Sequence, residues 1–194
     1  IRELLINGGS ADEFLTPESA AICARERAAG RAPVTMANAE RAILARLRAM
    51  REEDFAPFDG GGEGLYHRFY DAVQRETTID GILAAAKSKR YAYARLRRLL
   101  LAAYLGVTPE DIPQRVPYLR VLACNARGRE LLRYMKTTAA APVLTRSADV
   151  RRLDTDAQRL FALTARAEEQ YTLAYPSLAA AKPGSAWTTD PVIL

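Results

Sequence analysis

Apolar residues that recur at three- and four-residue steps are the feature that most restricts the fold of this chain. Between residues 35 and 51 the apolar positions are Met36, Ala39, Ile43, Leu47 and Met50. After a glycine-rich break the same spacing returns in Leu65, Phe69, Ala72 and Val73. In a helix this spacing places the apolar side chains on one face, which can pack against a core. The sequence therefore predicts a mainly helical protein.

Capping and breaking residues mark where the predicted helices begin and end. Thr16 followed by Pro17 is typical of a helix start, and Gly30 is typical of a stop. Thr78 can cap a further helix. A long helical stretch is expected from about Tyr91 to Gly106. A last helix is expected from about Asp156 to Tyr175, where Pro176 ends it.

Strand signals are sparse. Pro142-Val143-Leu144-Thr145 is the best strand candidate because it is short and partly β-branched. The tail after Pro176 shows no periodicity and is expected to pack as an extended strip.

The chain starts at Ile1, inside what reads as an amphipathic turn, and not at an initiator methionine. Gly8-Gly9 can then close this short helix. We therefore expect residues 1 to about 7 to be the last helix of an upstream part, with the domain proper following them.

The charge and the cysteines indicate the kind of partner and the compartment. The formal net charge is +5 and the isoelectric point is near 9.4, which makes a polyanion a better guess for the partner than an acidic partner of another kind. Cys23 and Cys124 stand far apart, which argues against a disulfide framework or a zinc site and for a reducing compartment. No apolar run approaches the roughly 20 residues of a membrane-spanning helix. The cytoplasm is the expected location.

One segment concentrates the positive charge. From Gly81 to Pro109 there is no aspartate or glutamate. The basic residues of this segment are Lys87, Lys89, Arg90, Arg95, Arg97 and Arg98. On a continuous helix one side would carry Lys87, Arg90, Tyr91, Arg95 and Arg98. The opposite side would carry Leu96, Leu99, Leu100 and Ala103, so we expect one side to pack and the other to face outwards.

Such a basic side suits a phosphate backbone, because arginine's planar fork can bind two phosphate oxygens. Tyr91 and Tyr93 add flat rings on which an unpaired base could stack. The alternative is a solvated face whose arginines pair with acids such as Glu52, Glu53 and Asp54 elsewhere in the fold. The residues alone leave both interpretations open.

Other candidate sites are weaker. His67 is the single histidine, so a cluster of several imidazoles is impossible within this chain, and a structural role on a helix is favoured. The glycine run before Leu65 lacks the Lys-Ser/Thr of a phosphate-binding loop. Glu168-Glu169 are adjacent on a helix and point in different directions. We assign no catalytic residue and no metal ligand.

Two stretches carry a family resemblance. One is Glu63-Gly64-Leu65 at the start of a helix, and the other is Lys87-Ser88-Lys89-Arg90-Tyr91 with the continuation Arg95-Leu96-Arg97-Arg98-Leu99-Leu100. Further blocks are Tyr118 to Leu122, Asn125, Gly128 and Pro142 to Thr145. In this order they resemble the bacterial tRNA(Met) cytidine acetate ligase family. The Lys-x-Lys-Arg-Tyr block is the most specific of them.

The resemblance implies an N-terminal Rossmann-like nucleotidyltransferase domain followed by a helical, tRNA-binding C-terminal region. By this resemblance, residues 1–9 are the last segment of a missing nucleotidyltransferase domain and residues 10–194 are a helical tRNA-binding C-terminal domain. The expected fold class is therefore a mainly α, helical domain with a short extended element, truncated from that N-terminal domain. The chain alone is then predicted to be inactive.

The resemblance also implies an activity and a set of site residues. The whole enzyme would use ATP to activate acetate as acetyl-adenylate and would acetylate the wobble cytidine of elongator tRNA(Met). Arg2, in the Ile1-Arg2 remnant of the family's Ser/Thr-x-Ile-Arg motif, would bind the ATP phosphates. The expected RNA-binding residues are Lys87, Lys89, Arg90, Tyr91, Arg95, Arg97 and Arg98.

Three alternatives remain open from the residues. The chain could be the RNA-binding module of another adenylyl-transferring enzyme, a nucleic-acid-binding regulator without enzymatic activity, or a helical scaffold whose basic face binds an acidic protein.

Overall fold

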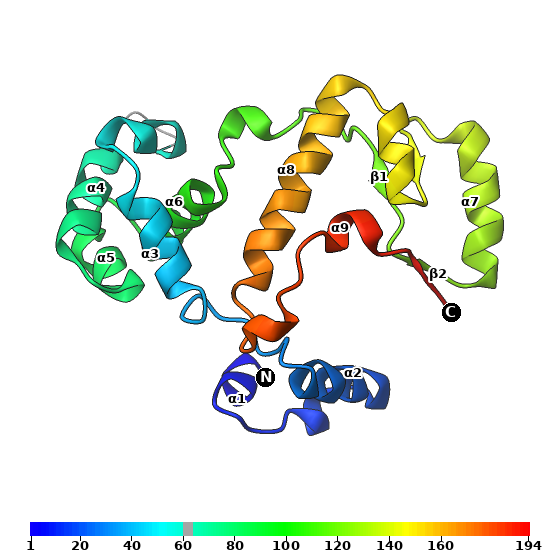
Figure 1. The fold of residues 1–194 in the computed structure, drawn as a ribbon, viewed down its shortest axis with the longest axis horizontal. Coiled ribbons are helices and arrows are strands. Elements are labelled where there is room, and N and C mark those ends of the chain that lie inside the picture. The colour runs from blue at the N-terminus through cyan, green and yellow to red at the C-terminus, as the bar shows by residue number, and fades with distance from the viewer. Residues whose placement is uncertain (60–63) are drawn as a thin grey trace. The chain divides into compact units, whose positions relative to one another are not determined.

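The computed structural model of the chain describes residues 1–59 and 64–194 (Figure 1). The chain divides into two compact units. Unit 1 comprises Ile1–Pro109 and Gln170–Pro183, and unit 2 comprises Glu110–Glu169 and Gly184–Leu194.

Unit 1 is helical in the part that the structure describes. Its α-helices are α1 (Arg2–Ile6), α2 (Pro17–Ala28), α3 (Glu40–Arg48), α4 (Leu65–Arg75), α5 (Ile79–Ala86) and α6 (Tyr93–Leu105). Its 3-10 helices are η1 (Asp12–Phe14), η2 (Glu52–Phe58) and η5 (Leu178–Ala180). The predicted caps are confirmed, since Thr16 Oγ1 accepts from the Ser19 amide at 3.4 Å and Thr78 Oγ1 from the Gly81 amide at 3.0 Å. Gly106 ends α6 with a φ of 68°.

The core of unit 1 lies among η2 and α3 to α6, which Figure 1 shows grouped in cyan to green. Its largest fully buried side chains are Phe55, Phe69, Ile43, Leu47, Leu65, Ile82, Leu83, Leu96, Leu100 and Val73. The two predicted apolar rows, before and after the glycines, thus meet in one core. The Phe55 and Phe69 rings pack with centroids 5.7 Å apart.

The helix expected between residues 35 and 51 is shorter in the structure, where α3 covers Glu40–Arg48. Asn38 accounts for the difference. Its amide Nδ2 donates to the Pro33 carbonyl at 3.2 Å and to the Ala174 carbonyl at 2.9 Å. These bonds hold the segment before α3, with its turn at residues 36–39, out of the helix, which apolar spacing alone does not reveal.

Unit 2 combines helices with two small parallel sheets. Its helices are α7 (Ala126–Thr138), α9 (Ser185–Thr188), η4 (Ser147–Arg152) and the larger part of α8 (Thr155–Thr172), and η3 (Pro109–Asp111) lies at its start. Strand β1 (Leu119–Arg120) pairs with β3 (Val143–Leu144). Strand β2 (Ala123–Cys124) pairs with β4 (Val192–Ile193). The strand predicted near Val143 is confirmed, whereas the tail folds into α9 and β4 and is not a plain extended strip.

The core of unit 2 is built around Phe161. The Trp187 ring meets it edge-on with centroids 4.7 Å apart, and the Arg120 guanidinium lies 5.2 Å from its centroid. Arg120 also pairs with Glu168 at 3.1 Å and donates to the Ala186 carbonyl at 2.9 Å. One arginine thus links β1, α8 and α9 within this unit.

None of the helices in the described ranges 1–59 and 64–194 combines the length and the apolar character that crossing a bilayer requires.

An ion pair between the buried Asp59 and Arg95 joins α6 to the end of η2 and the start of α4. Asp59 has a side chain only 2% exposed, and its Oδ1 lies 3.2 Å from Arg95 Nη2. The same nitrogen donates to the Asp59 carbonyl at 3.1 Å. The other carboxylate oxygen accepts from the Leu65 amide at 3.0 Å, at the start of α4. Asp59 therefore depends on Arg95 for charge compensation.

Replacing Arg95 by alanine is expected to destabilise unit 1, because it leaves the Asp59 carboxylate buried without its cation. The expected loss in the free energy of unfolding is about 3–5 kcal/mol. Urea unfolding followed by far-UV circular dichroism measures it. Arg98→Ala, on the exposed side of the same helix, is the matched control and is expected to change stability by less than about 0.5 kcal/mol. Equal stabilities for the two variants would contradict the assignment.

Candidate functional site

The basic segment, residues 87–98, is not one continuous helix. The structure ends α5 at Ala86 and starts α6 at Tyr93, so residues 87–92 form an irregular connection. The expectation that Lys87, Arg90 and Tyr91 share one helical side with Arg95 is therefore wrong. The reason lies in Ser88, whose hydroxyl accepts from the amides of Arg90 at 3.2 Å and Tyr91 at 3.3 Å and so favours a turn.

Arg68 on α4 fixes the start of the basic segment. Its Nε donates to the Ala86 carbonyl at 2.8 Å, and its Nη2 donates to the carbonyls of Ala85 at 3.0 Å and Lys87 at 3.1 Å. These are the last carbonyls of α5, where a cation is favourable. Sequence reasoning missed Arg68, because nothing local relates it to a helix end 18 residues later.

Tyr91 anchors the middle of the segment. Its side chain is buried, at 7% exposure, and the Arg95 guanidinium lies 5.3 Å from its ring centroid. A buried ring in this position packs under the backbone of the segment and is not available for stacking on a base. Tyr93 is more accessible, at 41% exposure, and Lys87 Nζ lies over its ring, 5.3 Å from the centroid.

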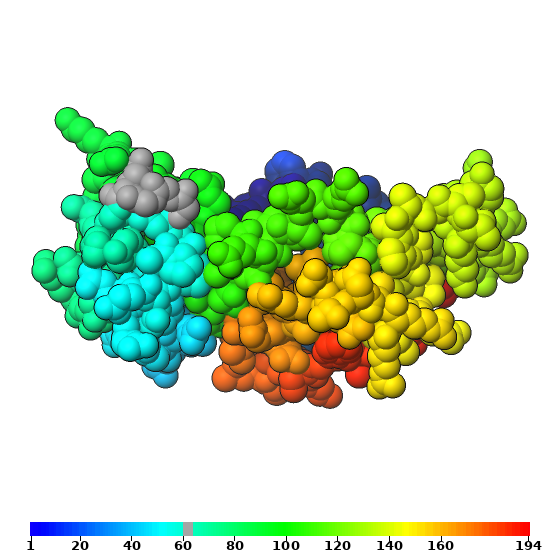
Figure 2. Space-filling model, turned by 90° about the horizontal axis from the view of Figure 1, so that it is seen from above, coloured from blue at the N-terminus to red at the C-terminus, as the bar shows by residue number. Residues whose placement is uncertain are grey.

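The remaining basic side chains of the segment point outwards. Lys87, Lys89, Arg90, Arg97 and Arg98 are all exposed. Within the described residues, Lys87, Lys89, Arg97 and Arg98 form no ion pair. The green segment that contains them reaches the surface in Figure 2. The side expected to pack is confirmed, because Leu96, Leu99, Leu100 and Ala103 are buried.

Two of the three acids considered as partners for this face, Glu52 and Asp54, have other partners. Glu52 Oε1 lies 2.5 Å from His67 Nδ1, and Asp54 Oδ2 accepts from the Arg51 amide at 2.8 Å. His67 is thus a surface helix residue beside an acid. The described part of the chain contains no group of three or more His, Cys, Asp or Glu side chains that could hold a metal ion. The glycines at 60–62 and Glu63 lie outside the described residues.

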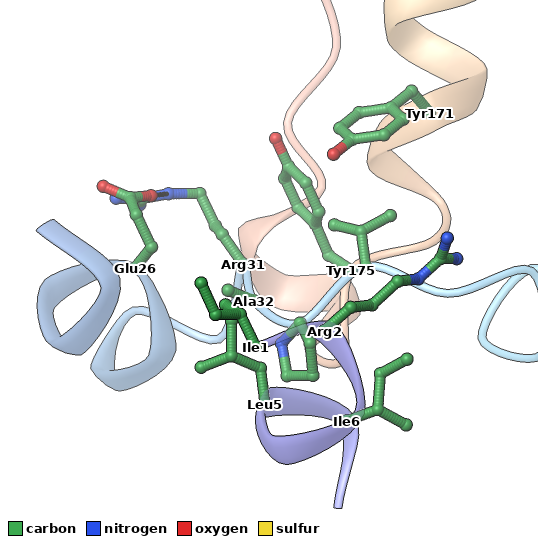
Figure 3. Close-up of a pocket in the computed structure, with 11 residues that line it drawn as sticks. Ile1, Arg2, Leu5, Ile6, Glu26, Arg31, Ala32, Tyr171 and Tyr175 are labelled. Atoms are coloured by element: carbon green, nitrogen blue, oxygen red, sulfur yellow. Dashed lines mark hydrogen bonds and ion pairs between the residues drawn. The ribbon is translucent and has the colours of Figure 1, made fainter. Parts of the chain in front are cut away.

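A second candidate site is a pocket of about 630 Å³ in unit 1 (Figure 3). It is lined by α1, by the end of α2 with the loop that follows, and by residues 171 and 175. Arg27 holds α1 in place, since its Nη1 donates to the Gly9 carbonyl at 2.9 Å and its Nη2 to the Leu5 carbonyl at 3.4 Å. Helix α1, which forms one wall of the pocket and contains Arg2, is therefore held in place by Arg27.

The aromatic wall of the pocket depends on Gly30. Gly30 has a φ of 69°, and a Cβ there would lie 2.5 Å from the Ser177 Cβ. The Ser177 amide donates to the Gly30 carbonyl at 3.0 Å. This close approach holds residues 170–177 beside the end of α2, where Tyr171 and Tyr175 meet edge-on with centroids 6.0 Å apart.

The charged side chains of the pocket differ in whether they are free to bind a ligand. Arg31 is 2.6 Å from Glu26, and Arg25 is 3.0 Å from the same carboxylate. The hydrogen bonds from Arg31 and then Arg25 lower the pKa of Glu26 to about 2. Arg2 is exposed and forms no ion pair among the described residues. In Figure 3 Arg2 extends on the side of the pocket away from the Arg31–Glu26 pair.

Chemically, this pocket offers a free guanidinium beside apolar and aromatic surface. Ile1, Leu5, Pro33 and Val34 add to the two tyrosine rings. An anionic ligand with a flat or apolar portion is the kind of molecule that such a lining suits. The basic segment offers unpaired cations around an exposed ring, which suits a polyanion.

Comparison with known proteins gives consistent matches. A sequence profile described as HIGH Nucleotidyl Transferase matches residues 1–185. The tRNA(Met) cytidine acetate ligase of Syntrophomonas wolfei is 28% identical over 187 residues, which are 92% of this chain and 45% of that protein. The enzyme of the same name from Kosmotoga olearia is 35% identical over 151 residues, which are 75% of this chain and 35% of that protein.

Solved structures agree with these matches. Thermotoga maritima TmcAL, in an apo form, matches with a TM-score of 0.86 at 26% identity and covers 93% of this chain and 46% of that one. TmcAL bound with alpha-thio ATP matches with the same TM-score and covers 47% of its chain. The chain thus spans less than half the length of these relatives.

The resemblance to tRNA(Met) cytidine acetate ligases is confirmed. The expected fold class is wrong, because the nucleotidyl transferase profile extends over residues 1–185 and not only over the first few. The chain also combines its helices with two small parallel sheets. Two-residue strands show no alternation, and helical spacing does not reveal to which domain a helix belongs. The boundary expected after residue 9 stays a prediction, as do the expected site residues.

The arginines beside Glu26 predict how this carboxyl titrates. The pKa of Glu26 in the folded chain lies below its ordinary value of 4.5. The stability that this carboxylate contributes is therefore fully present above about pH 4.5 and is lost as the pH falls towards about 2. Carboxyl NMR titration should show a midpoint near 2. Arg31→Ala should raise this midpoint towards 4.5, and Arg25→Ala should raise it less. A midpoint near 4.5 in the unaltered chain would contradict the geometry.

Proposed function

The chain belongs to the HIGH nucleotidyl transferase family, and we propose that it serves an ATP-dependent ligase that acetylates the wobble cytidine of elongator tRNA(Met). The proposal is carried by the match to TmcAL bound with alpha-thio ATP, which covers 93% of this chain. The names of the relatives in Syntrophomonas wolfei and Kosmotoga olearia support it.

In the proposed reaction ATP supplies the adenylyl group that activates acetate. An acetate oxygen attacks the α-phosphorus and pyrophosphate leaves. The exocyclic amine of the cytidine then attacks the acetyl carbonyl carbon, loses a proton, and AMP leaves. This chain has to bind polyanionic ligands in both steps, and its two candidate sites are both basic.

Arg2 is proposed to contact the ATP phosphates. Its guanidinium is free of ion pairs among the described residues, and Arg27 positions the helix that carries it. A planar guanidinium can bind two phosphate oxygens and can stabilise the charge that develops on the leaving pyrophosphate. Arg31, the other arginine of the pocket, is engaged by Glu26.

The basic segment is proposed to hold tRNA. Lys87, Lys89, Arg97 and Arg98 project from a backbone that is fixed at Arg68 and Tyr91, which reduces the entropy lost on binding. Tyr93 presents an exposed ring among them. Arg90 is exposed and is included with them, whereas Arg95 pairs with Asp59. Tyr91 is proposed to act by supporting this surface.

Two further expectations concern the activity of the chain by itself and its location. Inactivity of the chain by itself was expected from its supposed truncation, and the profile match over residues 1–185 does not support that ground. The assay below, run on residues 1–194 alone, checks whether the chain is active. The cytoplasm is the proposed location, because tRNA is the proposed substrate.

Arg2→Ala in the protein that carries this chain should lower the rate of acetate-dependent pyrophosphate release by about 100-fold or more. Stopped assays with ATP, acetate and tRNA(Met) measure it. Arg2→Lys should recover part of the loss, since it keeps the charge without the planar fork. The matched control is Arg46→Ala, an exposed arginine on α3. A rate that stays unchanged in Arg2→Ala would rule out the phosphate contact.

Neutralising the basic segment should weaken tRNA binding in a salt-dependent way. Each alanine substitution at a true phosphate contact among Lys87, Lys89, Arg97 and Arg98 should reduce the slope of log Kd against log salt by about 0.7–0.9. Salt titrations of tRNA(Met) binding give this slope. Leu96→Ala should instead cost about 2–5 kcal/mol of stability, because Leu96 is fully buried. Unchanged affinity and slope in all four variants would identify the segment as a solvated face.

A further inference from the structure

Helix α7 is the most exposed helix of unit 2 relative to its length. It runs for 13 residues and buries none of them. Figure 1 draws it at the edge of its unit, where it packs against β2 and β3. Leu132 and Met135 are half-buried on that side, and Gly128 allows its first turn to approach the Cys124 Cβ, which a Cβ would meet at 3.1 Å. The rest of the helix faces outwards.

The charge of unit 2 is concentrated in this helix. Unit 2 contains eleven lysines and arginines and nine aspartates and glutamates, an excess of two positive charges. Helix α7 contains four of the basic residues and one acid, Glu130, an excess of three. Outside α7 the unit therefore has a net charge of −1, so all of its excess positive charge lies in one exposed helix.

Three of these basic residues form a row. Arg129, Arg133 and Lys136 follow at steps of four and three residues, which places them along one side of the helix. At about 1.5 Å per residue the row extends over about 10 Å. All three side chains are exposed. None of them forms an ion pair with another residue of the described chain.

Three other arginines of unit 2 pair with acids. Arg120 pairs with Glu168, Arg152 with Asp149 and Arg159 with Asp111. Acids are thus available in the unit and neutralise other arginines, but they leave the α7 row uncompensated. A helix that carries three uncompensated cations in one row, on a fixed backbone, is suited to a ligand with regularly spaced negative charges.

We propose that the Arg129–Arg133–Lys136 row of α7 is a second RNA-contact surface, which binds phosphates of the same tRNA as the basic segment of unit 1. This inference rests on the proposed function. A nucleic acid fits the row better than an acidic protein, because the flanking Tyr134, 66% exposed, can stack on an unpaired base beside the bound phosphates.

The test is a triple variant in the full protein, Arg129→Gln, Arg133→Gln and Lys136→Gln, which removes three charges and keeps good helix formers. Its tRNA(Met) affinity should fall at least about tenfold at about 0.1 M salt, and its salt slope should fall by about two units. Far-UV circular dichroism checks that α7 and the fold are retained. A triple variant that binds tRNA as tightly as the parent, with the same slope, would overturn the inference.

Two controls make the result specific. Arg41→Gln with Arg46→Gln and Arg75→Gln removes the same charge from exposed positions of unit 1 and should leave the slope nearly unchanged. Tyr134→Ser leaves the charge unaltered and should weaken binding without changing the slope. Equal losses in the two triple variants would mean that net charge, and not the α7 row, sets the affinity. A parent protein that binds no tRNA would instead refute the proposed function.

Discussion

The buried contact between Asp59 and Arg95 is the constraint on which the arrangement of unit 1 depends. It joins the end of η2, the start of α4 and the first turn of α6 through a single carboxylate. The Asp59 side chain is only 2% exposed, and its carboxylate is stable there because it accepts a hydrogen bond from a backbone amide and pairs with a guanidinium. Because α6 contains the C-terminal part of the basic segment, residues 93–98, this ion pair also helps to position Arg97 and Arg98.

Two groups of basic residues in the chain have different roles. Arg27, Arg68 and Arg120 bind backbone carbonyls and hold elements together. Lys87, Lys89, Arg97 and Arg98 leave their charges exposed. Within unit 1 Arg68 positions the second group, since it fixes the last turn of α5 immediately before Lys87. Total charge cannot distinguish these groups, because a guanidinium contributes equally whether it binds a carbonyl or a ligand.

Local signals predicted the helices well and the site less well. The caps at Thr16 and Thr78 and the buried row from Leu96 to Ala103 follow from spacing and capping within a few residues. The turn at residues 87–92 was missed, because one serine hydroxyl outweighs a segment that otherwise reads as helix. The role of Arg95 and the pocket at Arg2 depend on contacts between residues far apart in the chain, which no local pattern contains. The family resemblance was right, but it led to a wrong fold class because the nucleotidyl transferase profile covers most of the chain.

Photo-crosslinking of tRNA(Met) to the protein, with the crosslinked peptides identified by mass spectrometry, tests the central claim most directly. The basic segment, supported by Tyr91 and Arg68, is proposed to bind tRNA. Crosslinks are expected at residues 87–98, strongest at the exposed Tyr93 and its neighbours, and are expected to be lost at high salt. Crosslinks that persist at high salt and fall wholly outside this segment would contradict it.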